Sequence, residues 1–114
     1  EGEKPTGYII ILGDKDIKPF FEIEAGIVAQ TILLGAAEKG FGGVMVKAFK
    51  REALREWMDL DANLEIVLVI ALGKPAEICV IEDYDENKGI EYYRDVDGVH
   101  HVPKRTLDEL IVHW

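Results

Sequence analysis

Cysteine is nearly absent from this sequence, since Cys79 is the only one among 114 residues. One cysteine excludes an internal disulfide framework and favours a reducing, cytoplasmic setting. Cys79 stands in the apolar stretch "AEICVIED", which predicts a short strand. We therefore expect Cys79 to be a buried strand thiol.

Long apolar runs are also missing. The most apolar helix-like stretch, "AGIVAQTILLGAA" at residues 25–37, contains Gln30 and Thr31. It falls short of the roughly 18 unbroken apolar residues that predict a membrane helix. No basic segment followed by an apolar segment stands at the start of the chain, so no signal peptide is predicted.

Basic residues are scarce beside acidic ones, because 13 lysines and arginines face 22 aspartates and glutamates, for a net charge of −9. This balance disfavours non-specific binding to nucleic acid or to an anionic membrane. The remaining composition, 48% hydrophobic and 31% charged, is typical of a globular protein. The length then predicts a single domain over residues 1–114.

The motifs of several enzyme classes are missing. The sequence contains no G-x-S-x-G elbow, no G-x-G-x-x-G fingerprint and no phosphate-binding loop. His100 and His101 are adjacent in an extended segment, so their side chains point to opposite faces and do not suit one shared metal ion. We therefore predict neither a metal site nor a catalytic side chain supplied by the protein.

What is present is an alternation of strand-like and helix-like segments. Apolar runs bounded by Gly, Pro and Asp predict strands, and periods near 3.6 predict helices. Strands are predicted at residues 7–13, 42–49, 65–75 and 76–83, helices at residues 22–39 and 50–60, and extended chain from residue 90 with a turn at Asp97-Gly98. This order is typical of an α/β or α+β fold with a sheet covered on both faces.

The two predicted helices differ in their apolar pattern. The helix at 22–39 is apolar nearly all round, which predicts burial on several sides, either as a central helix or in a subunit interface. The helix at 50–60 is amphipathic, and we expect Ala53, Leu54, Trp57 and Met58 on its inner side.

The glycine-rich turn "KGFGGVMV" at residues 39–46 has two interpretations. In the first, Gly40 ends the preceding helix and the small residues allow close packing of helix against strand. In the second, the backbone N–H groups of Gly42, Gly43 and Val44 lie open to a flat ligand that side chains would otherwise block.

The basic pair in "HHVPKRTLDE" also has two interpretations. Lys104 and Arg105 precede a short helical turn, for which Thr106 and Glu109 have capping-box spacing. The two cations are either a solvated surface pair or an anion clamp assisted by the N–H donors of the helix start.

The order of these features resembles the second half of a nitroreductase-family flavoprotein. The resemblance rests on the long apolar helix ending in "GFGG", the "KREALRE" helix, the hydrophobic strand ending in "ALGKP" and the basic motif "PKRTLDELI". It covers about residues 7–112. The endings "ALGKP" and "PKRTLDELI" together carry most of its specificity.

The resemblance implies an α+β fold with a mostly antiparallel sheet flanked by helices in an intertwined homodimer. It implies FMN at the dimer interface and hydride transfer from NAD(P)H through FMN to nitroaromatic, quinone or related acceptors. On this basis Gly42, Gly43, Val44 and Met45 are expected against the flavin ring, and Lys104 and Arg105 are expected to bind the flavin phosphate.

One family feature is missing from these 114 residues. The family's R-[RS]-[ST]-x-R motif, whose basic side chains bind the flavin, does not occur, and the chain begins at Glu1 without methionine. We therefore expect the C-terminal part of a longer protein, either a proteolytic fragment without the N-terminal segment or one part of a nicked protein that keeps this segment as a separate piece. Three functions remain open: an FMN-dependent oxidoreductase, a truncated non-catalytic flavin- or nucleotide-binding module, and a dimerisation module.

Overall fold

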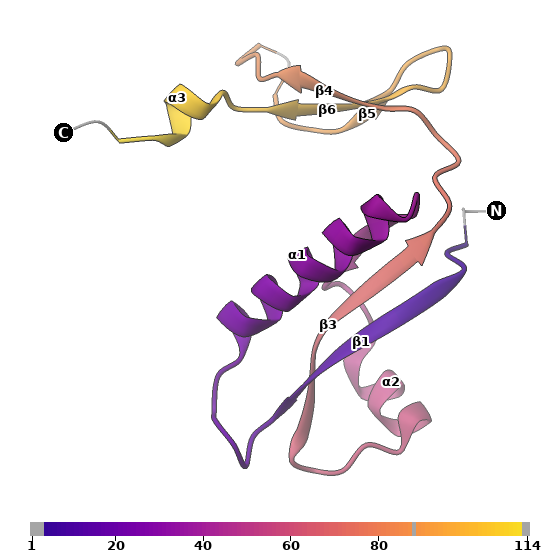
Figure 1. Ribbon diagram of the computed structural model, residues 1–114, viewed down its shortest axis with the longest axis vertical. Coiled ribbons are helices and arrows are strands. Elements are labelled where there is room, and N and C mark those ends of the chain that lie inside the picture. Colours follow the sequence, from indigo (N-terminus) through magenta and orange to yellow (C-terminus); the bar gives the residue numbers. More distant parts are fainter. Residues whose placement is uncertain (1–3, 88, 113–114) are drawn as a thin grey trace. The chain divides into compact units, whose positions relative to one another are not determined.

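The computed structural model describes residues 4–87 and 89–112. The chain divides into two compact units, Glu1–Pro75 and Ala76–Trp114 (Figure 1), which are described separately below. The prediction of a single domain over residues 1–114 stays a prediction.

The first unit is built on a three-stranded antiparallel sheet with the order β1-β3-β2. The central strand β3 carries the apolar run from Ile66 to Leu72, and Ile66 and Ile70 are fully buried. A strand with neighbours on both edges and helices over its faces favours this unbroken apolar sequence. The strands are β1 (Gly7–Asp14), β2 (Gly42–Val46) and β3 (Leu64–Gly73).

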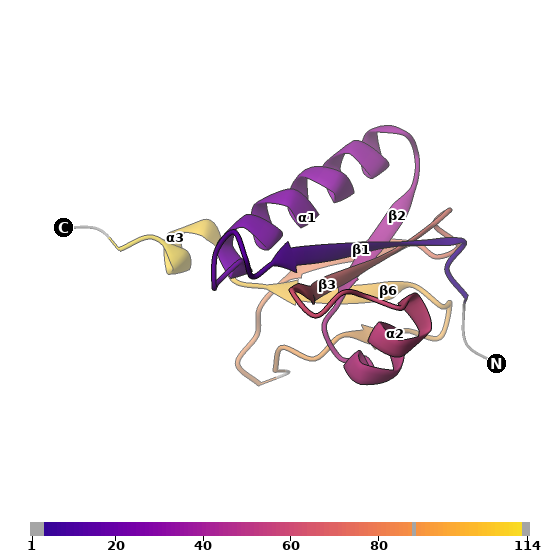
Figure 2. The same cartoon turned by 90° about the horizontal axis from the view of Figure 1, so that it is seen from below.

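Two helices flank this sheet. Figure 2 shows α1 (Glu22–Glu38) on one side and α2 (Arg51–Met58) on the other. Ala25 and Ala29 of α1, one helical turn apart, are buried, and α1 contacts β2 and β3. Small side chains on this stripe let the helix axis approach the sheet closely. An α+β arrangement with an antiparallel sheet flanked by helices is thus confirmed for residues 4–75.

Within this unit α1 is not a central helix, which was one of the two predicted placements, and its predicted burial in a subunit interface stays a prediction. Only Ala25 and Ala29 of the helix are buried there, and Ile27 is 64% exposed. A single sheet face covers one stripe of a helix and leaves the other apolar side chains uncovered. The exposed set comprises Ile23, Ile27, Val28 and Leu34.

The predicted inward-facing side of α2 is confirmed for two of its four predicted residues. Leu54 and Met58 are half-buried, whereas Ala53 is exposed and Trp57 is 81% exposed. The inward place on the last turn belongs to Arg55, which donates hydrogen bonds to the carbonyl oxygens of Leu60, Asp61 and Leu64. These three carbonyls lie beyond the helix, in the loop after α2 and at the start of β3, so Arg55 connects α2 to the chain that follows it.

The second unit is a small mixed sheet with the order β4-β6-β5, in which β4 runs parallel to β6 and β5 antiparallel to it. Its elements are β4 (Cys79–Asp83), β5 (Tyr93–Arg94), β6 (His100–Lys104) and the short helix α3 (Leu107–Leu110). The predicted capping box of Thr106 and Glu109 is confirmed at the start of α3. Cys79 lies on a strand as predicted but is exposed, because β4 is an edge strand of this sheet.

Candidate cofactor-binding site

The turn between α1 and β2 begins with a glycine that ends the helix. Gly40 has a φ of +76°, and the backbone N–H groups of Gly40 and Phe41 donate to the carbonyl oxygens of Ala37 and Ala36 at 2.9 Å each. A left-handed residue in this place closes the last turn of a helix, and glycine adopts it without steric cost. The interpretation of Gly40 as a helix stop is confirmed.

Gly43 lies where the helix and the sheet approach most closely. A Cβ added at Gly43 would be 2.6 Å from the Cδ2 atoms of both Leu33 and Leu72, and 2.9 Å from the carbonyl oxygen of Ala71. These distances are too short for a real side chain, so the absence of a Cβ is required by packing. For Gly43 the close-packing interpretation is confirmed, and a ligand is not needed to explain this glycine.

The strand that follows presents an open backbone edge. β2 pairs with β3 on one side only, so alternate N–H groups along its other edge have no partner in the sheet. Val44 is 57% exposed, and Gly43 and Met45 are also exposed. At Gly42 an added Cβ would lie 3.3 Å from Pro75 Cγ, a tight contact, so the missing side chain leaves room for the proline beside the strand. This edge fits the face or rim of a flat ligand that accepts backbone hydrogen bonds.

The two predicted cations are placed differently from one another. Lys104, at the end of β6, donates from Nζ to the hydroxyl of Tyr92 at 3.0 Å and lies 5.1 Å from the centre of its ring. Arg105 follows in the loop before α3 and is exposed. Within residues 4–87 and 89–112 its guanidinium forms no hydrogen bond or ion pair. Arg105 is therefore the better placed of the two to bind an anion.

The predicted site residues fall into both units. Gly42 to Met45 form one strand of the first unit, and Lys104 and Arg105 belong to the second. Each half of the predicted site is described within its own unit, and the joint binding of one flavin by both halves stays a prediction.

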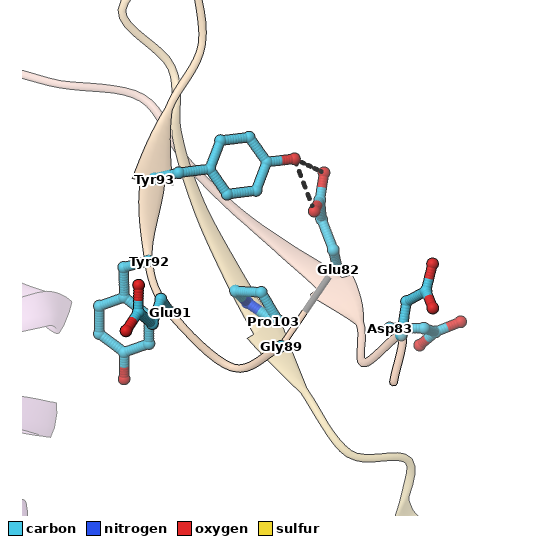
Figure 3. A pocket seen from close by; sticks show the side chains of 8 residues that line it. Glu82, Asp83, Gly89, Glu91, Tyr92, Tyr93 and Pro103 are labelled. Carbon is cyan, nitrogen blue, oxygen red and sulfur yellow. Dashed lines mark hydrogen bonds between the residues drawn. The ribbon is translucent and has the colours of Figure 1, made fainter. Parts of the chain in front are cut away.

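Two cavities lie away from the predicted residues. One, of about 380 Å³, is lined in the second unit by Glu82, Asp83, Asp85, Gly89, Glu91, Tyr92, Tyr93 and Pro103 (Figure 3). Its carboxylates disfavour a phosphate group. The other, of about 400 Å³ in the first unit, is lined by charges of both signs, with Lys15, Arg51 and Arg55 beside Glu52 and Glu65. The open β2 edge, rather than a cavity, is the feature that fits the predicted flavin contact.

The histidine surroundings were not foreseen from the sequence. His101 lies between the carboxylates of Glu82 and Asp95, and the hydrogen bonds that its ring donates, chiefly to Asp95 and then to Glu82, raise the pKa of this imidazole. His100 points to the other face of β6, toward Glu77. Alternating side-chain directions were predictable, but the carboxylate partners come from other segments, of which only Glu82 is in a strand, and carry no local sequence signal.

The described residues contain no cluster of three metal-ligating side chains. In the same part of the chain, none of the helices has the length and apolar character needed to cross a membrane.

Comparison with known proteins identifies the family. The sequence model of the nitroreductase family matches residues 5–74, which include β1, α1, β2, α2 and β3. The chain belongs to the nitroreductase family. The matched range includes the glycine turn and most of "ALGKP". It does not include "PKRTLDELI", so the family role of that motif stays a prediction.

Solved structures give the same assignment. A nitroreductase family protein from Clostridium difficile 630 is 32% identical, with a TM-score of 0.56 over 62% of this chain and 46% of its own. A protein described as an NADH dehydrogenase/NAD(P)H nitroreductase from Bacteroides thetaiotaomicron VPI-5482 is 29% identical, with a TM-score of 0.58 over 74% and 53%. A protein described as an NADH oxidase from Clostridium acetobutylicum is 28% identical, with a TM-score of 0.54 over 60% and 45%.

These matches cover only part of each solved structure. This chain spans about half the length of the solved relatives, since it covers 46%, 53% and 45% of their chains. A search of curated proteins finds no significant match. The family and the partial fold are therefore established, and the activity of the whole protein is a matter for proposal.

Proposed function

We propose that this chain is part of an FMN-dependent NAD(P)H oxidoreductase that acts as a homodimer on nitroaromatic, quinone or related acceptors. The observation that carries the proposal is the nitroreductase-family match over residues 5–74, which contains the exposed edge strand β2. FMN, when bound, supplies the hydride-accepting ring. The chain's own residues then have to bind the cofactor, orient it and stabilise its charge.

The edge of β2 provides orientation and electrostatics. The alternate backbone N–H groups of Gly42 to Met45 that point away from β3 are fixed donors that favour negative charge on a reduced flavin ring. A donor held by a sheet needs no rearrangement when that charge develops. No acid, base or nucleophile of the protein is required for hydride transfer, in agreement with the lack of catalytic motifs.

Binding of the phosphate is assigned to the basic pair. The guanidinium of Arg105 offers a planar set of donors that suits phosphate oxygens, and Lys104 adds a positive charge close by. Lys104 is already bonded to Tyr92, so it contributes mainly through its charge.

A second candidate is a module that binds flavin or nucleotide without turnover, or that serves in dimerisation. The exposed apolar side chains of α1 favour the dimerisation variant of this candidate.

Flavin titration tests the proposal. We expect the full chain to quench FMN fluorescence on binding, and to bind riboflavin more weakly because riboflavin lacks the phosphate. NADH or NADPH added without oxygen should then bleach the flavin absorbance. Bleaching supports the oxidoreductase, and binding without bleaching supports the non-catalytic module. Absence of flavin from the protein purified from its native source would contradict both flavin-binding candidates and leave dimerisation.

A further inference from the structure

The central strand of the second unit holds a histidine whose two ring nitrogens both face carboxylates. In β6, His101 Nδ1 is 2.5 Å from Glu82 Oε1, and Nε2 is 3.1 Å from Asp95 Oδ2. The His101 side chain is only 16% exposed. A carboxylate oxygen accepts hydrogen bonds, so both nitrogens must carry a hydrogen to satisfy both contacts. This geometry requires the positively charged imidazolium.

The partners of His101 come from different segments of the unit. Glu82 belongs to β4, which runs beside β6, and Asp95 opens the turn that joins β5 to β6. The ring of Tyr93, in β5, stacks on the imidazole with centroids 4.6 Å apart and planes at 4°. One side chain therefore connects β4, β6 and the β5–β6 turn.

Both carboxylates are held in place by further donors. The Tyr93 hydroxyl donates to both oxygens of Glu82, at 3.0 and 3.2 Å (Figure 3). Asp95 Oδ1 accepts the backbone N–H groups of Asp97 and Val99, at 3.0 and 2.9 Å. The carboxylates therefore keep their positions whether or not His101 is charged.

The titratable groups that face His101 among the described residues are Glu82, Asp95 and Tyr93. The carboxylates, Asp95 first and then Glu82, raise the pKa of His101 above its ordinary value of 6.5. Glu82 in turn raises the pKa of Tyr93, so this phenol remains a hydrogen-bond donor well into the alkaline range. Within this group of four side chains, the imidazole is the one that changes charge as the pH rises through its raised pKa.

Loss of the imidazole proton breaks this arrangement. A neutral ring has one N–H, so its other nitrogen directs a lone pair at a carboxylate oxygen. One of the two hydrogen bonds between His101 and the carboxylates must then break. Because the pKa of folded His101 is raised, the stabilisation is fully present below 6.5 and is lost as the pH rises through the higher folded value.

We propose that His101 is a pH-sensitive clamp on the β4-β6-β5 sheet, closed while the imidazole is protonated and opened at one carboxylate link when it is not. This inference goes beyond the proposed function and does not depend on flavin binding. The clamp lies on the strand that ends at Lys104, so it controls how firmly that strand is held.

The opposite face of β6 provides a matched control. His100 bonds through Nδ1 to Glu77 Oε1 at 3.0 Å, and Glu77 Oε2 is 2.6 Å from the guanidinium of Arg94. Glu77 thus keeps a cationic partner whatever the state of His100. A glutamine at position 100 removes an imidazole from the same strand and leaves every partner of His101 unchanged.

An NMR titration of the full 114-residue chain tests the clamp. The ring signals of His101, assigned with His101→Gln, should titrate above 6.5, and the Val99 amide and Tyr93 ring signals should shift with the same midpoint. Asp95→Asn keeps an oxygen acceptor for the turn but removes the charge, so the His101 midpoint should fall. Glu82→Gln should lower the midpoint in the same way.

The amide transition should persist in His100→Gln and disappear in His101→Gln. A His101 midpoint at or below 6.5 in the parent chain would overturn the proposal, as would a Val99 transition that survives in His101→Gln. Should His101→Gln fail to fold, the His101 midpoints of the parent and of Asp95→Asn still test the clamp. The clamp requires the midpoint in Asp95→Asn to be lower than in the parent.

Discussion

At position 43 the space next to Cα is already occupied by neighbouring atoms. A Cβ there would meet the side chains of Leu33 and Leu72 and the carbonyl oxygen of Ala71. The leucine ends can move, but the carbonyl belongs to the central strand. We expect Gly43→Ala to lower the free energy of unfolding by about 1–3 kcal/mol, as overpacking does. Urea unfolding of the full chain measures this change.

Gly26 is a matched control for that substitution. It lies in α1 with no atom within 4 Å of an added Cβ, so Gly26→Ala should raise the free energy of unfolding by about 0.5–1 kcal/mol. A Gly43→Ala variant with the same free energy of unfolding as the parent would contradict the close packing of Leu33, Leu72 and Ala71 around Gly43.

The contribution of the basic pair to flavin binding is a second residue-scale prediction. Arg105→Ala should weaken FMN binding about 10- to 150-fold, because it removes a charge-assisted bond to the phosphate. Lys104→Ala should weaken FMN binding clearly less, since Lys104 is hydrogen-bonded to Tyr92. Fluorescence titration with FMN, and with riboflavin as the control ligand, measures both. Equal losses would assign the phosphate to both cations, and no loss would make the pair a solvated surface feature.

Single residues show where sequence reasoning works and where it fails. Gly40 as a helix stop and Thr106 with Glu109 as a capping box were predictable, because those signals are local in the chain. The need for glycine at position 43 depends on Leu33, Leu72 and the backbone at Ala71 together, so the sequence left packing and ligand binding as alternatives. The partners of His101 lie on separate segments and were not predictable.

At the scale of elements, α1 exposes apolar side chains on the faces that the sheet does not cover. Ile27→Asp should weaken self-association of the full chain, because it places a charge in the surface on which the proposed homodimer depends. Light scattering measures the mass of the particle, and circular dichroism checks that helix content is kept. Ile27 suits this test because it is 64% exposed, whereas Ile32 and Leu33 are half-buried.

Gln30→Asp is the control on the same helix, since it adds the same charge at a site that is already polar and exposed. It should leave the mass unchanged. A parent chain that is monomeric at all concentrations, or an Ile27→Asp variant with the parent's mass, would remove α1 from the proposed dimer interface.

The elements themselves were largely predictable, but their inward faces were not. All the predicted strands and helices are present, because apolar runs and glycine, proline and capping signals are properties of the local chain. The orientation of α2 was half wrong, since Arg55 rather than Trp57 turns toward the carbonyls at Leu60 and Leu64. That preference depends on unsatisfied carbonyls in the following loop, which the helical period does not reveal.

For the whole molecule, acid should be destabilising. The carboxylates of the described part of the chain whose pKa is lowered include these four: Glu24, chiefly by Lys18; Glu77, by His100 and then Arg94; Asp95, by His101; and Glu109, by Thr106. Their ordinary values are 4.5 for glutamate and 3.8 for aspartate, so their stabilisation is fully present above 4.5 and is lost as the pH falls through the lower folded values.

The urea midpoint should therefore fall between neutral pH and pH values below 3.8. Below the pI of about 4.7 the chain also gains net positive charge, which acts in the same direction. Glu109→Gln removes one of these four carboxylates, so its urea midpoint should fall less on acidification than the midpoint of the parent. A midpoint that does not change over this range would contradict the assigned carboxylate contacts.

The open edge of β2 also affects the tendency of the protein to aggregate before any ligand is bound. Its five residues, "GGVMV", carry no charge and no proline, which are two of the features by which natural edge strands resist pairing with a strand of another molecule. The unpaired N–H groups that suit a flavin therefore also form a template for intermolecular sheet growth. Under the proposed function, a flavin lying along β2 would cover that template, so loading of the cofactor would also protect the chain against aggregation.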